Sequence, residues 1–181
     1  MTTSQLNFSH IGLYAFDYEA LADFYKECLG FVETDRGDID GVVDLIFMTR
    51  DPKEHHQVVV ASGRTAARDT KLLNQISFRI PDLETLKKIA KSIERDGRGS
   101  AFSAVNHGCA WAVYFNDPEG NRIELFTDSP WYIPQPCKGA LDLDKPTEQI
   151  LTETEAMCRA EPGYRPMSEF QAEVAQKLAL N

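Results

Sequence analysis

Three side chains that lie far apart in the sequence have the chemistry of metal ligands: His10, Gln75 and Glu124. An imidazole, an amide oxygen and a carboxylate are all competent ligands for a divalent ion, and three protein ligands leave coordination positions open. Glu124 lies within the apolar segment 122–126, where an inward carboxylate must be paired, hydrogen-bonded or metal-bound. Singly, each residue also fits an ordinary role, as a sheet histidine, a core amide or a surface carboxylate. Together they predict an open metal site of the catalytic type.

Three further residues suit proton transfer beside such a site. His56 stands two residues before Val58, so the two side chains share one face of a strand, and an imidazole that titrates at about pH 6.5 suits acid/base chemistry. Tyr114 precedes Glu124 by ten residues, and His107 lies in the loop ahead of Tyr114. We predict His56, Tyr114 and His107 as catalytic residues. The alternatives are a strand-end histidine in solvent, a core aromatic and an exposed loop histidine.

The elements that must position these residues follow a βαβββ pattern that occurs twice. Apolar residues recur at helical spacing over 18–29, where the stripe stops at Gly30, and again over 82–95. Short β-rich runs bounded by turn residues surround both helices. The predicted strands are 7–15, 31–36, 42–50 and 55–62 in the first module, and 74–80, 99–105, 110–115 and 121–128 in the second.

Sliding the sequence on itself supports a tandem repeat. At an offset of 65 residues His10 falls on Gln75, and at an offset of 66 residues Val58 falls on Glu124. If the two modules pair their sheets, the side chains at these four positions point into a shared cavity. The predicted fold is therefore α+β, with two tandem βαβββ modules, at about 7–62 and 74–128, that form curved sheets around one cavity in a domain over 1–128.

Composition and charge exclude several classes of protein. The chain has 181 residues, 43% hydrophobic and 26% charged, which is typical of a globular domain. A net charge of −9, with no run of Lys or Arg, disfavours nucleic-acid binding. No apolar run approaches the roughly 18 residues of a membrane span, and the first residues lack a signal-peptide pattern. We expect a cytoplasmic protein without a membrane partner, and its four dispersed cysteines are expected to be reduced thiols.

Three segments carry a resemblance to a known family: Phe8-Ser-His-Ile-Gly-Leu-Tyr14, Leu21-Ala-Asp-Phe-Tyr-Lys-Glu-Cys-Leu-Gly-Phe31 and Phe115-Asn-Asp-Pro-Glu-Gly-Asn-Arg-Ile-Glu-Leu-Phe126. They resemble the vicinal oxygen chelate superfamily, which joins glyoxalase I, bleomycin-resistance proteins and type I extradiol dioxygenases. The resemblance covers about residues 7–128. The extradiol dioxygenases are the closer match, because the sequence also has the pair His55-His56 and a tyrosine ten residues before Glu124.

The resemblance implies a role for each candidate residue. His10 and Glu124 would hold Fe(II), His56 would be the acid/base histidine, and Tyr114 would hydrogen-bond the substrate. The sequence departs from the dioxygenase pattern at Gln75, where those enzymes have a second histidine ligand. A neutral amide oxygen is a weaker donor than imidazole, but glutamine is an accepted ligand in glyoxalase I-like members. We therefore expect Fe(II), with Mn, Ni or Zn as alternatives.

The implied function is a ring-cleaving, extradiol-type dioxygenase that acts on a small aromatic, catechol-like diol with O₂. A first alternative is a glyoxalase- or epimerase-type lyase or isomerase, in which a divalent ion stabilises an enediolate. Val58 speaks against it, because those members resemble a four-ligand arrangement with a carboxylate on that strand. A second alternative is a metal-free protein that binds small molecules, like the bleomycin-resistance proteins.

Residues 129–181 lie outside the two modules and are expected to form a C-terminal helical extension. Apolar stripes predict helices over 147–160 and 168–180. These stripes either complete the core or form a lid or a dimer surface near the cavity. We expect a homodimer on the basis of this amphipathic extension.

Overall fold

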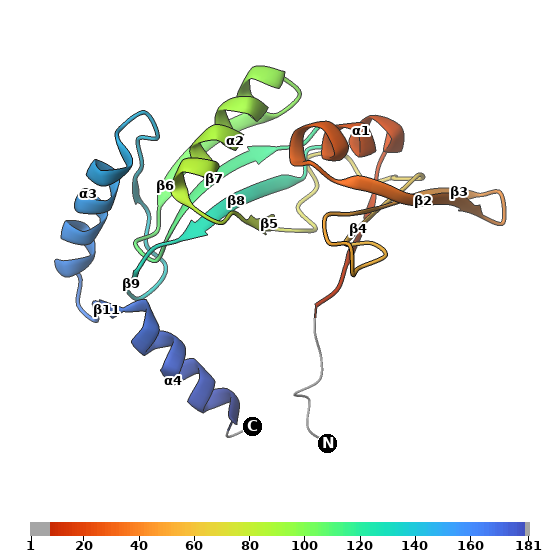
Figure 1. Cartoon of the computed structure of the whole chain (residues 1–181). Coiled ribbons are helices and arrows are strands. Elements are labelled where there is room, and N and C mark those ends of the chain that lie inside the picture. Colours follow the sequence, from red (N-terminus) through yellow and green to blue (C-terminus); the bar gives the residue numbers. More distant parts are fainter. Residues whose placement is uncertain (1–7, 180–181) are drawn as a thin grey trace. The chain divides into compact units, whose positions relative to one another are not determined.

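The computed structural model describes residues 8–179 of the chain. They form two compact units, the first made of residues 8–74, 96–100 and 116–121, and the second of residues 75–95, 101–115 and 122–179. The predicted α+β class is confirmed (Figure 1). The predicted strand start at Asn7 and helix end at Leu180 lie outside the described residues.

The first unit is a four-stranded sheet with one helix packed on it. The strands are β1 (Ile11–Tyr14), β2 (Val32–Ile39), β3 (Val43–Thr49) and β4 (Val58–Ala61), in the order β1-β4-β3-β2. β1 runs parallel to β4, and the other neighbours are antiparallel. α1 (Tyr18–Leu29) buries an apolar stripe that includes Leu21, Phe24 and Leu29. The helix has the predicted bounds.

Local signals at both ends fix the bounds of α1. Asp17 is the N-cap residue, and its side chain accepts a hydrogen bond from the backbone N–H of Ala20 at 3.0 Å. Gly30 adopts φ +71°, and its N–H bonds the carbonyl of Tyr25. A left-handed residue at this position ends the helix and turns the chain into β2, so the sequence pattern alone locates the helix.

The second unit repeats the same topology. Its elements are β5 (Ile76–Arg79), α2 (Leu83–Asp96), β6 (Ser100–Asn106), β7 (Ala110–Asn116), β8 (Arg122–Asp128) and β10 (Gly139–Ala140). The strand order is β10-β6-β7-β8-β5, with β5 parallel to β8. Without β10, this order corresponds strand for strand to that of the first sheet. The tandem βαβββ architecture predicted from the sequence is present.

Strand pairing corrects one predicted alignment of the two modules. Gly12 pairs with Val59 in the first sheet, as Ser77 pairs with Glu124 in the second. The offset is therefore 65 residues for both strands, and the equivalent of Glu124 is Val59 rather than Val58. The predicted inward position of Val58 is wrong, because this side chain is only 1% exposed within the core of the first unit. The spacing from Asp51-Pro52 to Val59 is one residue longer than the spacing from Asp117-Pro118 to Glu124, so an alignment anchored on the Asp-Pro turns misplaces the strand.

The C-terminal extension adds α3 (Thr147–Arg159) and α4 (Met167–Ala179), together with the short strands β9 (Trp131–Tyr132) and β11 (Arg165–Pro166). α3 belongs to the core of the second unit, since Thr154 is fully buried and accepts hydrogen bonds from Asn106 Nδ2 and Trp111 Nε1, both at 2.8 Å. Over residues 8–179, none of the helices combines the length and apolar character needed to cross a membrane.

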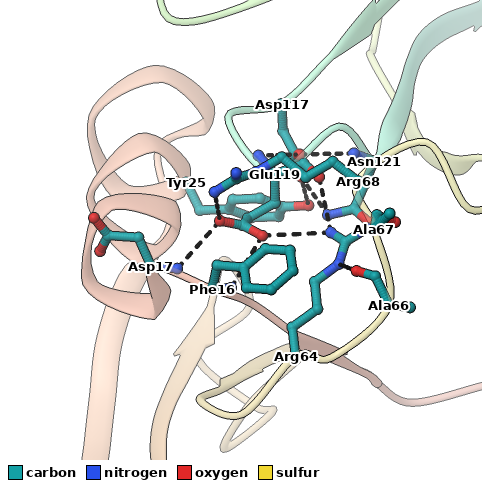
Figure 2. Close-up of polar contacts among 10 residues, drawn as sticks. All are labelled: Phe16, Asp17, Tyr25, Arg64, Ala66, Ala67, Arg68, Asp117, Glu119 and Asn121. Carbon is teal, nitrogen blue, oxygen red and sulfur yellow. Dashed lines mark hydrogen bonds and ion pairs between the residues drawn. The ribbon is translucent and has the colours of Figure 1, made fainter.

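A buried carboxylate organises the turn between β7 and β8, which belongs to the first unit. Glu119 is 1% exposed. Its side chain accepts hydrogen bonds from the backbone N–H groups of Phe16 at 3.0 Å and Asp17 at 3.1 Å, and from the guanidinium groups of Arg68 at 2.8 Å and Arg64 at 3.4 Å (Figure 2). We call these five residues the Glu119 cluster. Four charged or polar donors stabilise the ionised form, and the pKa of Glu119 is lowered although burial opposes this.

Asp117, two residues earlier, has the opposite electrostatic balance. It is 3% exposed, and its carboxylate accepts the backbone N–H groups of Glu119 and Asn121 as well as the Asn121 side-chain amide. The Tyr25 hydroxyl lies 3.5 Å from Oδ2. Burial, with the nearby charge of Glu119, raises the pKa of Asp117 to about 6 despite these hydrogen bonds.

The raised pKa of Asp117 predicts a specific pH dependence of stability. The folded protein binds the Asp117 proton more tightly than the unfolded chain between about pH 4 and pH 6, so this group makes the free energy of unfolding fall as pH rises through that window. Between pH 4 and pH 7, we expect the difference in unfolding free energy between the wild type and Asp117→Asn to change by about 3 kcal/mol against the wild type. Urea unfolding at several pH values tests this. Parallel pH profiles of the two proteins would contradict it.

Candidate functional site

The centre of the candidate site in the second unit is Glu124 on β8. Its side chain is buried, with 8% exposure. One carboxylate oxygen accepts the Tyr114 hydroxyl at 2.5 Å, and the other accepts the Gln75 side-chain amide at 2.6 Å and the Ser77 hydroxyl at 2.5 Å. The apolar context of Glu124 therefore marks an inward carboxylate, as predicted, and three neutral donors surround it.

Tyr114 on β7 is held as a hydrogen-bond donor. Its ring is 7% exposed. Burial, followed by the hydrogen bond and the charge of Glu124, raises the pKa of Tyr114 well above its ordinary value. The phenol stays protonated at all pH values at which the protein works, so it donates to Glu124 or to a ligand that replaces this contact.

His107 extends the chain of contacts from Tyr114. Its Nε2 lies 2.9 Å from the Tyr114 hydroxyl, and its Nδ1 lies 2.6 Å from the carbonyl oxygen of Cys137. A carbonyl only accepts, so Nδ1 carries hydrogen. The Tyr114 hydroxyl therefore lies between Nε2 of His107 and the carboxylate of Glu124, and it links the two side chains.

Gln75 precedes β5, and its side-chain amide donates a hydrogen bond to Glu124. Its Nε2 also lies 3.0 Å from the Ser77 hydroxyl. Within the described part of the chain, its Oε1 makes no hydrogen bond, so the amide oxygen is available to a ligand or a cation. An amide oxygen and a carboxylate side by side are hard donors of the kind that Fe(II) or Mn(II) accepts.

The predicted histidines of the first unit lie together before β4. The rings of His10 and His56 are 4.3 Å apart between centroids, and His56 also packs edge-on against Phe47 at 5.2 Å. His55 Nδ1 lies 2.9 Å from His56 Nδ1. Partial burial, and then the charges of His10 and His55, lower the pKa of His56. His56 is thus poised as a neutral imidazole, the form that accepts a proton.

The route by which His56 joins His10 differs from the predicted one. β4 begins at Val58, so His55 and His56 precede the strand and the alternation of faces does not extend to them. The contact of His56 with Phe47, which pairs with Val59, nevertheless brings His56 to the same face of the sheet as His10. The two rings are adjacent although the argument from Val58 does not hold, and the catalytic role of His56 stays a prediction.

The candidate residues therefore form two groups, one in each unit. His10 and His56 meet in the first, and Gln75, His107, Tyr114 and Glu124 form one connected network in the second. In residues 8–179, no set of three or more His, Cys, Asp or Glu side chains is arranged to hold a metal ion. The ligand set His10, Gln75 and Glu124, which includes an amide and draws on both units, stays a prediction.

Sequence reasoning missed two residues of the second group. Ser77 donates to Glu124, and its position two residues after Gln75 places it on the same face of β5, a signal that was present in the strand pattern. Arg122 stacks its guanidinium 4.3 Å from the centre of the Tyr114 ring and stands two residues before Glu124. Both follow from strand alternation once Glu124 is taken as the reference.

We compared the chain with known protein families and with known proteins. A family model described as the Glyoxalase/Bleomycin resistance protein/Dioxygenase superfamily matches residues 7–125. No curated protein matches the chain.

Several solved structures are similar to the chain at low sequence identity. A glyoxylase/bleomycin resistance protein/dioxygenase domain from Frankia sp. EAN1pec has a TM-score of 0.58 at 18% identity, over 68% of this chain and 98% of its own. The fosfomycin resistance protein FosX from Mesorhizobium loti has a TM-score of 0.54 at 18% identity, over 68% and 92%. FosX from Listeria monocytogenes, complexed with Mn(II) and sulfate, has a TM-score of 0.53 at 17% identity, over 68% and 93%. At these identities the similarity establishes a shared fold.

Proposed function

Because the chain belongs to the Glyoxalase/Bleomycin resistance protein/Dioxygenase superfamily, we propose that it is a metal-dependent dioxygenase of the extradiol type, acting on an aromatic diol. One observation carries the proposal. Two of the three predicted metal ligands, His10 and Glu124, each have a side chain suited to proton transfer beside them. His56 lies against His10, and the Tyr114 hydroxyl touches Glu124. A protein that only binds its ligand has no need of this pairing.

In this proposal His10, Gln75 and Glu124 hold Fe(II), with Mn(II), Ni(II) or Zn(II) as alternatives. Their imidazole, amide oxygen and carboxylate fit the ion by donor type. Bound Fe(II) would supply the redox chemistry with O₂ and the positive charge that lets a diol ionise. One ring C–C bond of the diol breaks, and both atoms of O₂ enter the ring-opened product, so no further reductant is consumed.

The chain's own residues would do the proton work. His56, as a neutral imidazole, accepts the proton of a diol hydroxyl. Tyr114 donates a hydrogen bond to the substrate oxygen when the contact with Glu124 is replaced, and His107, in contact with the Tyr114 hydroxyl, orients it. Phe47, packed against His56, offers an aromatic surface for the ring of the substrate.

One observation favours a second candidate function, a metal-free protein that binds small molecules. Gln75 Nε2 donates a hydrogen bond to Glu124 at 2.6 Å, so the carboxylate has a hydrogen-bond donor without a cation. The register of β4 speaks against a third candidate, the lyase or isomerase. The equivalent of Glu124 is Val59, so a fourth ligand at that position is lacking.

The metal content of anaerobically purified protein, followed by oxygen uptake with a panel of catechols, tests the proposal. We expect about one iron per chain in the wild type and a loss of at least about tenfold in metal affinity in His10→Ala and in Glu124→Ala, because each removes a direct ligand. The matched controls are His55→Ala and Glu155→Ala, which remove an imidazole and a carboxylate outside the ligand set. Lack of metal at any loading would overturn the proposal in favour of the metal-free binding protein.

A further inference from the structure

The face of the second sheet that carries Glu124 also carries two arginines, Arg79 and Arg122, and only Arg79 is in an ion pair. Arg79 on β5 is paired with Asp128 on β8, and its guanidinium lies 4.6 Å from the centre of the Phe126 ring. Arg122 is exposed and stacks on Tyr114, yet it makes no ion pair with any residue of the described chain.

The missing ion pair of Arg122 is not explained by a shortage of carboxylates. Glu124 stands two residues along the same strand, about 7 Å away along β8, and alternation puts the two side chains on one face. Both oxygens of Glu124 are instead occupied by Tyr114, Gln75 and Ser77. The network thus occupies the carboxylate, and within residues 8–179 the Arg122 guanidinium makes no hydrogen bond or ion pair.

The ring of Tyr114 holds the guanidinium in place. A cation over an aromatic face is attracted to it, and stacking through the planar face leaves the edge N–H groups free. Those N–H groups form a fork that matches a carboxylate in bidentate geometry. The stacked, partnerless Arg122 is therefore preorganised for a planar oxyanion next to the Glu124 network.

We infer that Arg122 is a specificity-determining residue that binds a carboxylate substituent of the substrate. The inference rests on the proposed function and deepens it, because it names the substrate class as an aromatic diol that carries a carboxylate. The diol oxygens face the Tyr114 and Glu124 side of the site, and the carboxylate pairs with Arg122. Arg79, already neutralised by Asp128, takes no part.

The test compares benzoate with benzamide, its neutral isostere, by calorimetric titration of the full-length protein in a buffer free of carboxylates and phosphate. The wild type is expected to bind benzoate more tightly, and Arg122→Gln is expected to weaken benzoate binding at least about tenfold with little effect on benzamide. Arg122→Lys keeps the charge but not the fork, and it should recover only part of the preference. Arg79→Gln is the matched control and should behave like the wild type.

A wild type without preference for benzoate, or an Arg122→Gln variant that retains it, would overturn the inference. This titration needs neither metal nor turnover. A negative result would therefore contradict the carboxylate subsite without testing the dioxygenase proposal. A second arm compares oxygen uptake with catechol and with 3,4-dihydroxybenzoate. If benzoate binding depends on Arg122 but neither diol is turned over, the carboxylate subsite is supported and the dioxygenase proposal is contradicted. If both diols were turned over with equal kcat/KM, and Arg122→Gln left these values unchanged, the dioxygenase proposal would be supported and the carboxylate subsite would be ruled out.

Discussion

Glu119→Ala is expected to lower the free energy of unfolding at pH 7 by about 3–5 kcal/mol, the range for removing one partner of a buried, hydrogen-bonded ion pair. The carboxylate is 1% exposed and satisfies Arg64, whose side chain is only 10% exposed, together with two backbone N–H groups at the start of α1. Its removal strands a buried cation and leaves those donors unpaired. Chemical denaturation followed by circular dichroism measures the loss.

The matched control is Glu155→Ala, which breaks the exposed pair with Arg159 on α3. Exposed helix pairs contribute little, so no measurable change is expected there. Glu119→Gln keeps the shape and one acceptor oxygen, and it should fall between the alanine variant and the wild type. If Glu119→Ala were as stable as Glu155→Ala, the Glu119 cluster would have no role in folding.

The sequence predicts α1 residue for residue because all of its signals are local. Asp17, Gly30 and the apolar stripe between them lie within fourteen residues, and each acts on the backbone next to it. The repeated topology is predictable for the same reason, since the helix and strand patterns of the two modules are each readable alone. The short strands β9, β10 and β11 lack such signals, because two-residue strands form only where another segment already lies beside them.

The role of Glu119 illustrates what local patterns leave out. The turn 116–121 is recognisable by its Asp, Pro and Gly, but that pattern says nothing of whether the glutamate points inward. Its partners Arg64 and Arg68 are more than fifty residues away in the chain, and the backbone donors at Phe16 and Asp17 more than a hundred. Burial of this charge depends on those distant donors.

The residues of the candidate site also differ in how far local sequence patterns predict them. Glu124 was noticeable in the sequence because a carboxylate between Ile123 and Leu125 is unusual in an apolar strand, and its side chain is buried. The position equivalent to it in the first module was misplaced by one residue because turn length, unlike strand alternation, is not periodic. Since Val58 and Val59 are the same residue type, the error leaves the predicted ligand set unchanged.

His56→Phe is expected to keep the metal content of the wild type and to lose about 10²- to 10⁴-fold in turnover, the usual contribution of a general base. The imidazole is half-buried between His10 and Phe47, with ring centroids 4.3 Å and 5.2 Å away, so a phenyl ring of similar shape can occupy its place. The variant removes the proton acceptor and leaves His10, the predicted ligand, intact. Metal analysis and oxygen uptake on the same preparation separate the two effects.

His55→Phe is the neighbouring control. It removes the contact between the two Nδ1 atoms at 2.9 Å but keeps the imidazole of His56, so a loss of less than about tenfold is expected. A His56→Phe variant with full activity would remove His56 from the mechanism. Loss of metal in that variant would instead make His56 a ligand, and the acid/base role would then fall to the chain of Glu124, Tyr114 and His107. Equal losses in both variants would contradict an acid/base role specific to His56 and would mean that the two histidines act together.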